Sequence, residues 1–141
     1  MLVRKAAPAD ALDVLAWRND PAARAMSRTP DEVQEAAHIE WFNTALDDPR
    51  RTLLIGEADG HKVGMVRFDQ GQDTEVSITV NPACRGRGLG QALLAEALKW
   101  VRGDVVAEVR PENLVSQRLF ERAGFTFTGL HDGLRRYVGR A

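Results

Sequence analysis

The residues best suited to chemistry lie in the segment Arg85-Gly-Arg-Gly-Leu-Gly90, between two apolar stretches. Glycines let a backbone approach a ligand closely, and the free N–H groups at a helix start attract anions. A turn of this composition that enters a helix therefore predicts a bound phosphate group. Arg85 and Arg87 would add charge-assisted hydrogen bonds to that phosphate, and the alternative for each is a solvated loop charge.

Two common phosphate motifs do not fit this segment. A Walker loop needs Gly-Lys followed by Ser or Thr, which the segment lacks. A dinucleotide fingerprint starting at Gly86 and Gly88 would need a third glycine where Gln91 stands. A flexible basic turn without a ligand is the plain alternative.

The elements that must position this turn follow from the spacing of apolar residues. Helices are predicted from Pro8 and over residues 35–47, 89–101 and 113–123. Strands are predicted over residues 2–5, 52–58, 62–69, 75–80, 104–109, 125–130 and 134–138. This order predicts an α/β (α+β) fold in one domain, residues 1–141, with a mixed, mostly antiparallel sheet of about six or seven strands and helices on both faces. In the first helix, the predicted apolar stripe is Leu12, Leu15 and Ala16, with Ala11 and Val14 beside it.

Composition narrows the class of protein. The chain has 141 residues, 44% of them apolar, and a net charge of -1, so it has no general attraction to nucleic acid or to an anionic membrane. No apolar run is long enough to span a membrane, and the single Cys84 cannot form an internal disulfide. We therefore expect a cytoplasmic protein, a monomer or a homodimer, and no metal site.

Two motifs carry a resemblance to a known family. Val80–Gly90 resembles the acyl-coenzyme-A loop of the GNAT superfamily of N-acetyltransferases, whose pattern is Arg or Gln, two free positions, Gly, one free position, and Gly or Ala. Arg85, Gly88 and Gly90 match that pattern. The stretch Asn113-Leu-Val-Ser-Gln-Arg-Leu-Phe-Glu-Arg-Ala-Gly-Phe125 resembles the second coenzyme motif of the family. The predicted strand order agrees over nearly the whole chain.

The resemblance implies acetyl-coenzyme A as cosubstrate and no metal. The amides of residues 86–90 would hold the pyrophosphate, and the preceding strand would separate from its parallel neighbour to pair with the pantetheine arm. The implied coenzyme-binding residues are Ile78, Thr79, Val80, Arg85, Gly86, Arg87, Gly88, Leu89, Gly90, Asn113, Ser116 and Phe120. Asn113 is equally well placed as a helix N-cap, and Ser116 could be structural.

Glu75 is the predicted general base. An alkyl ammonium, whose ordinary pKa is about 10.4, must lose a proton before it can attack an acyl group. Many GNAT enzymes place a catalytic glutamate at the start of the strand that Glu75 opens. The alternatives are a solvated or ion-paired edge glutamate and, less favoured, Asp73 as the base. The resemblance implies that a backbone N–H near residues 78–80 stabilises the oxyanion formed in the attack.

The general acid is where this sequence departs from the family. Many members have a tyrosine that protonates the leaving thiolate, but Phe120 occupies that position. Tyr137, the only tyrosine, could replace it only if its strand reaches the site. Phe120 therefore keeps open a catalytically degenerate coenzyme-binding module.

The acceptor pocket is expected in the first third of the chain. Trp17-Arg-Asn-Asp-Pro21, His38-Ile-Glu-Trp-Phe42 and Met65–Asp69 resemble a GNAT branch that acetylates nucleotide-linked amino sugars. Ribosomal-protein N-terminal acetyltransferases begin similarly, so a peptide N-terminus is the alternative to a small-molecule amine. The expected substrate contacts are Arg18, Asn19, His38, Trp41 and Arg67. Core packing for Trp41, a structural role for His38 and an ion pair for Arg67 are the competing interpretations.

Overall fold

The computed structural model describes residues 1–27 and 31–141 and contains one seven-stranded sheet. The strand order is β1-β2-β3-β4-β5-β7-β6, and every neighbouring pair is antiparallel except β4 and β5. The strands are β1 (Leu2–Lys5), β2 (Arg51–Ala58), β3 (His61–Gln70), β4 (Thr74–Val80), β5 (Asp104–Val109), β6 (Thr126–His131) and β7 (Leu134–Arg140). The mixed, mostly antiparallel sheet predicted from the sequence is confirmed.

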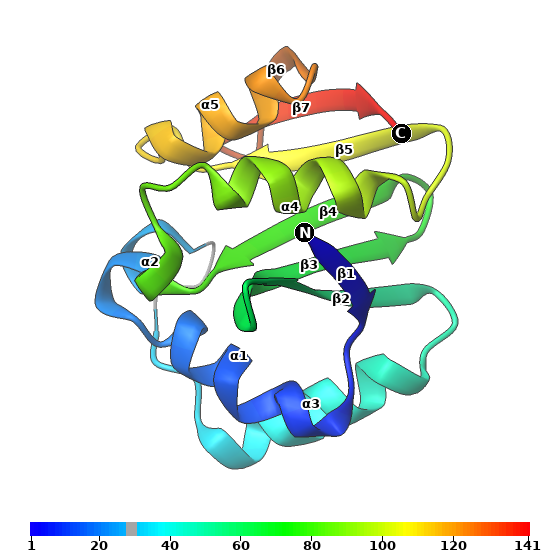
Figure 1. Cartoon of the computed structure of the whole chain (residues 1–141). Coiled ribbons are helices and arrows are strands. Elements are labelled where there is room, and N and C mark those ends of the chain that lie inside the picture. The colour runs from blue at the N-terminus through cyan, green and yellow to red at the C-terminus, as the bar shows by residue number, and fades with distance from the viewer. Residues whose placement is uncertain (28–30) are drawn as a thin grey trace.

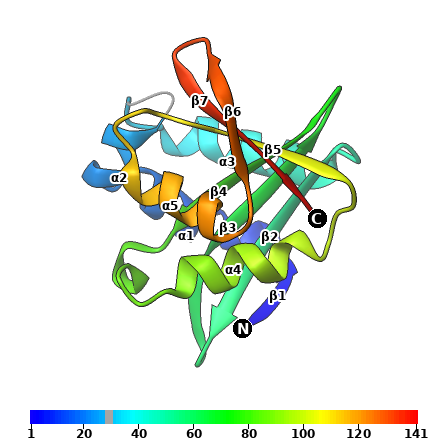
Figure 2. The same cartoon turned by 90° about the horizontal axis from the view of Figure 1, so that it is seen from above.

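Helices cover both faces of the sheet, as Figures 1 and 2 show. The helices are α1 (Ala11–Arg18), α2 (Pro21–Met26), α3 (Glu35–Asp47), α4 (Leu89–Leu98) and α5 (Leu114–Arg122), with 3-10 turns at Pro8–Asp10 and Pro82–Cys84. Among the described residues, no helix has the length and apolar character needed to cross a membrane.

Two apolar cores separate the helices into two groups. We call one side of the sheet the α4 face, where Leu93, Leu94 and Ala97 of α4 pack with Phe68 and Val76 of the sheet. The other side is the α1/α3 face, where buried residues of α1 and α3 meet those of β2 and β3: Ala11, Val14, Trp17, Phe42, Ala45, Leu53, Ile55 and Met65. Since successive strand residues point to opposite faces, β2 and β3 contribute buried residues to both cores.

The predicted apolar stripe of α1 is wrong by one position. Ala11, Val14 and Trp17 are the buried residues, while Leu12 is 55% exposed. The bulk of Trp17 decides the orientation, because burying its ring removes more apolar surface than burying a leucine. Helix α4 also ends at Leu98 rather than at the predicted residue 101.

The two parallel strands separate along their length. Strands β4 and β5 pair only at Thr74 with Val105 and at Glu75 with Val106. Beyond Glu75, β4 continues to pair with β3 on its other side, through to Val80. The backbone of residues 76–80 therefore has one edge that β5 does not occupy, as expected from the family resemblance.

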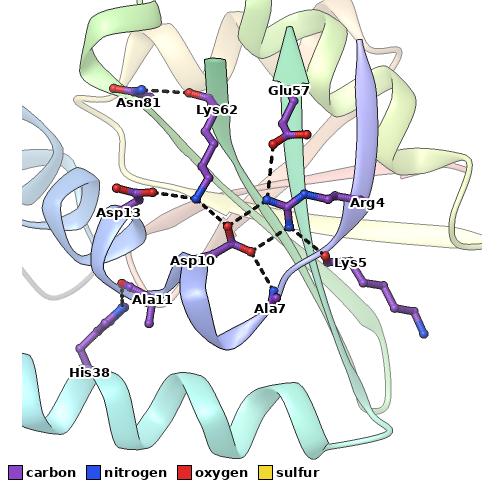
Figure 3. A network of polar contacts seen from close by, with 10 residues as sticks. All are labelled: Arg4, Lys5, Ala7, Asp10, Ala11, Asp13, His38, Glu57, Lys62 and Asn81. Atoms are coloured by element: carbon purple, nitrogen blue, oxygen red, sulfur yellow. Dashed lines mark hydrogen bonds and ion pairs between the residues drawn. The ribbon is translucent and has the colours of Figure 1, made fainter. Parts of the chain in front are cut away.

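A polar network ties the N-terminal segment to the sheet (Figure 3). Asp10 is 2% exposed and accepts hydrogen bonds from Arg4 Nη1 and Nη2 at 2.8 and 2.9 Å and from the Ala7 N–H at 2.8 Å. Lys62 Nζ on β3 lies 2.8 Å from the same carboxylate and 2.7 Å from Asp13. Asp10 thus joins β1, α1 and β3, and its Pro-Ala-Asp context at the start of a helix was the only sequence signal for it.

Candidate active site

The glycine turn lies between β4 and α4 and has the backbone that only glycine adopts easily. Gly86 and Gly88 have φ values of 77° and 71°, and Gly88 directly precedes the first residue of α4. A Cβ at either position would meet no atom within 4 Å, so the conformation rather than crowding demands glycine there. The turn therefore presents exposed backbone at a helix N-terminus, which suits an anion.

The base of this turn is fixed to β3. Asn81 donates from its side chain to the Lys62 carbonyl at 2.9 Å, and its backbone N–H donates to the Val63 carbonyl at 2.8 Å. Cys84 is buried, and its Sγ lies 3.8 Å from the same Lys62 carbonyl. Lys62 thus links the turn to the Asp10 network through its backbone. A structural role for Cys84 fits this arrangement.

Helix α2 is tied at both ends to the loops that follow β4 and β5. Asp20 caps α2 by accepting from the Ala23 N–H at 3.1 Å and pairs with Arg85 of the glycine turn at 2.9 Å. At the other end, Arg110 donates to the carbonyls of Ala25 and Ser27 at 3.3 and 3.2 Å. Sequence reasoning missed the roles of Asp20 and Arg110, because the sequence around a charged loop residue does not indicate which distant residue it contacts.

The second coenzyme motif forms helix α5 as predicted. The Asn113 side chain accepts from the Ser116 N–H at 3.1 Å, which confirms the N-cap interpretation of Asn113. Phe120 is 3% exposed and packs against Phe125 with ring centroids 5.2 Å apart. Tyr137 is fully buried on β7, and its hydroxyl accepts from Arg135 Nε at 3.0 Å. Since β5 lies between β7 and β4, the structure gives Tyr137 no place beside β4.

Glu75 stands where β4 and β5 part. It pairs with Val106 of β5 in the last parallel step and faces Asp69 across the β3 side. Its neighbour Val76 is buried in the α4 core, so the Glu75 side chain lies on the α1/α3 face. A shallow groove of about 430 Å³ contains Glu75 together with charged residues of neighbouring strands and turns, including Asp69, Asp73, Glu108, Arg51 and Arg136.

Arg18, Trp41 and Arg67, expected from separate parts of the sequence, meet on the α1/α3 face. The guanidinium carbons of Arg18 and Arg67 lie over the Trp41 ring, 5.1 and 5.2 Å from its centroid. Arg67 Nε pairs with Asp69 at 3.0 Å, as its competing interpretation predicted. Trp41 is therefore already engaged by two cations, which leaves it a poor open platform for a sugar ring.

His38 contacts this cluster through Arg18. It is 1% exposed, its Nε2 lies 2.7 Å from the Ala11 carbonyl, and its Nδ1 lies 3.2 Å from Arg18 Nη1. A carbonyl only accepts and a guanidinium only donates, so His38 is neutral with its proton on Nε2. Burial, and next the charge of Arg18, lower the pKa of His38. Contact between His38 and an acceptor would break one of these bonds, and the geometry favours a role in orienting Arg18.

Asn19 also has its side chain occupied within the chain. Its amide donates to the Val33 carbonyl at 2.9 Å and accepts from the Val33 N–H at 2.8 Å. It thereby fixes Val33 against the end of α1. This placement makes Asn19 a positioning residue of the acceptor side.

A mixed sheet opened between two parallel strands, with a glycine turn entering a helix beside the opening, defines an acetyl-transfer enzyme. Comparison with known families makes this specific. Residues 11–125 match the acetyltransferase (GNAT) family, and the chain belongs to that family. It is an N-acetyltransferase whose acyl donor is acetyl-coenzyme A.

Several relatives resemble most of the chain. YwnH of Bacillus subtilis, whose name provisionally describes a phosphinothricin acetyltransferase, is 29% identical over 153 residues, covering 99% of this chain and 93% of that protein. The N-alpha-acetyltransferase RimI of Mycobacterium tuberculosis is 37% identical over 103 residues, covering 68% of this chain and 63% of RimI. A solved structure provisionally described as a phosphinothricin N-acetyltransferase is 28% identical, with a TM-score of 0.81, and covers 99% of this chain and 97% of its own.

The residues present fit acetyl-coenzyme A. The β4 edge not occupied by β5 offers backbone groups to an amide-bearing arm, and the open turn at Gly86 and Gly88 offers N–H groups to phosphates. Within residues 1–27 and 31–141, no group of three or more His, Cys, Asp or Glu side chains is arranged to hold a metal ion.

Proposed function

We propose that this chain transfers the acetyl group of acetyl-coenzyme A to the primary amine of a small acceptor bound on the α1/α3 face. The observation that carries this proposal is the position of Glu75 at the point where β4 and β5 separate. Its side chain lies on the α1/α3 face beside the shallow groove, while the glycine turn follows the other end of the same strand. Strand β4 thus connects the proposed general base, Glu75, to the turn proposed to bind phosphate.

In this proposal the backbone of residues 78–80 and 86–90 holds the coenzyme, with Arg85, Arg87, Asn113 and Ser116 around it and Phe120 packed behind. Acetyl-coenzyme A supplies an acetyl group activated as a thioester. Glu75, directly or through water, takes one proton from the acceptor ammonium, and the neutral nitrogen forms its bond to the acetyl carbon as the carbon–sulfur bond breaks. The nitrogen gives up its second proton to water as the amide forms. A backbone N–H of residues 78–80 stabilises the negative oxygen.

The thiolate leaves without a side-chain acid in this scheme. A thiol with a pKa of about 8.5 is a tolerable leaving group as a thiolate, and water can protonate it later. Phe120 has no proton to give, and the hydroxyl of Tyr137 is engaged by Arg135 in the core.

The acceptor class is the finer part of the proposal. The nucleotide-linked amino sugar expected from the sequence stays a prediction, and phosphinothricin joins it because of the relatives that cover nearly the whole chain. A peptide N-terminus is the second candidate, supported by the 37% identity to RimI.

The experiment follows free thiol release from acetyl-coenzyme A with these three acceptors, for the wild type and for Glu75→Gln. We expect the substitution to lower kcat by about 100- to 10,000-fold with an unchanged coenzyme affinity, because it removes only the base. Glu96→Gln is the matched control, since Glu96 on α4 is 39% exposed and pairs with Lys99 at 3.0 Å.

Two results would contradict the proposal. Unchanged turnover in Glu75→Gln removes Glu75 from the mechanism. Tight coenzyme binding without thiol release for any acceptor indicates the catalytically degenerate module instead.

A further inference from the structure

Arg18, Trp41 and Arg67 form a cationic cluster that acetyl transfer itself does not require. They come from α1, α3 and β3, so the fold rather than local sequence gathers them around one indole ring. We infer that this cluster binds the anionic group of the acceptor, and that the acceptor is a compact amine bearing a carboxylate, phosphinate or phosphate. The inference rests on the proposed function only for the placement of the amine.

The first argument is the charge balance of the cluster. Arg18 has no acidic partner among the described residues, and its polar side-chain contact there is with the neutral His38. Arg67 uses its Nε for Asp69, so its terminal N–H groups have no protein acceptor in the described part of the chain. Each guanidinium has five N–H donors, and most of the ten therefore remain available to an acceptor.

The second argument is the proximity of the two like charges. Arg18 is half-buried, and burial followed by the charge of Arg67 lowers its pKa. Asp69 offsets one of the two charges through its pair with Arg67, so the cluster retains an excess positive charge that a further anion would offset. A carboxylate, phosphinate or phosphate does so with bidentate, charge-assisted hydrogen bonds. Trp41 and His38 hold Arg18 in place, which reduces the entropy lost when the anion binds.

The third argument is the distance to the proposed base. Arg67 lies directly opposite Ser77, and Glu75 is two residues from Ser77 on the same face of the sheet. Diagonal neighbours of this kind lie about 7 to 8 Å apart. An acceptor that reaches both must have its amine and its anion within the length of one amino-acid side chain. The same cations disfavour a polyamine, which would bring further positive charge to Trp41.

The experiment measures binding by calorimetry with coenzyme A present, so that it does not depend on turnover. The probes are L-glutamate, then L-glutamine, which keeps only the α-carboxylate, and the amide of L-glutamine, which has neither acid. Phosphinothricin, a nucleotide-linked amino sugar and spermidine complete the set. We expect an anionic probe to bind best and its affinity to fall about 10- to 100-fold in Arg18→Gln and in Arg67→Gln. Lysine at either position should recover only part of the affinity, because it lacks the planar fork.

Arg102→Gln is the matched control, because Arg102 is an exposed arginine on the turn between α4 and β5. Coenzyme affinity and melting temperature identify any variant that has lost its fold. If a glutamine variant has lost its fold, the anion affinity of the corresponding lysine variant tests the inference instead. Three results would overturn the inference. Spermidine binds best, no anionic probe binds, or the Arg18 and Arg67 variants bind the anionic probes as tightly as the wild type does. Anion binding without thiol release would leave it standing and contradict the proposed function.

Discussion

Replacing Asp10 by asparagine tests the buried network that joins the N-terminal segment to the sheet. The carboxylate is 2% exposed and has Arg4, Lys62 and the Ala7 N–H as partners, all at 2.8 to 2.9 Å. Removing one member of a buried ion pair typically costs about 3 to 5 kcal/mol. Arg4 and Lys62 are 33% and 28% exposed, so water can partly solvate them. We therefore expect a loss of about 3 kcal/mol, at the low end of that range.

Urea denaturation followed by circular dichroism measures this loss, and Asp13→Asn is the matched control. Asp13 binds the same Lys62 but is 54% exposed, so its removal should cost under about 1 kcal/mol. In thermal unfolding, a loss of about 3 kcal/mol corresponds to about 10 °C for a chain of this length.

The stability difference between the wild type and Asp10→Asn should also depend on pH, in a direction that follows from the pKa of Asp10. Hydrogen bonds from Arg4, and then from Lys62 and the Ala7 N–H, hold the pKa of Asp10 well below its ordinary value. In the unfolded chain an aspartate takes up its proton near pH 3.9. The stabilisation by Asp10 is therefore complete above about pH 5 and is lost as the pH falls below about 4, so the difference between wild type and Asp10→Asn should shrink there. The reasoning is refuted if Asp10→Asn costs no more than Asp13→Asn, or if the difference stays constant down to about pH 3.5.

Two further predictions concern the coenzyme side. A Cβ on Gly64 would collide with the Thr79 carbonyl, so Gly64→Ala should displace the end of β4, destabilise the fold by about 1 to 3 kcal/mol and weaken coenzyme A binding in calorimetry. Asp20→Asn keeps a good α2 cap but releases Arg85, so coenzyme A should bind about two- to fivefold more tightly if Arg85 contacts its phosphates.

Each of these has its own control and contrary result. Gly71→Ala is the control for Gly64, because its Cβ would approach only the Asp73 carbonyl, at 3.9 Å. Equal stability of the two alanine variants would show that β3 has room at Gly64. Arg85→Gln should remove the effect of Asp20→Asn, and weaker coenzyme binding in Asp20→Asn would show that Asp20 positions Arg85 instead.

The sequence predicted elements best where one physical signal dominated. Helix α3 and strand β5 have the predicted bounds, because apolar spacing and the Asp-Pro or Gly boundaries agree there. The phase of α1 was wrong because Trp17, at the end of the helix, outweighs the leucines before it. Local spacing cannot weigh one bulky ring against several smaller side chains.

The candidate site shows the same division. The glycine turn is local, so its position was predictable from consecutive residues. The contacts of Arg18 with Trp41 and Arg67 join three elements far apart in the chain, and only the tertiary packing decides them. For the same reason Arg67 was a candidate but its neighbour Asp69 was not, and Asp10 was missed altogether.

The alternation of side chains along β4 constrains how this chain can change in evolution. Val76 and Ile78 pack toward α4, whereas Glu75 and Ser77 lie on the α1/α3 face. One residue inserted into β4 would exchange these two sets and send the glutamate into the apolar core. Insertions should therefore be excluded from β4, while the N-terminal helices, which pair with no strand, can change length and side chains. New acceptors can thus arise without disturbing the strand that serves the coenzyme.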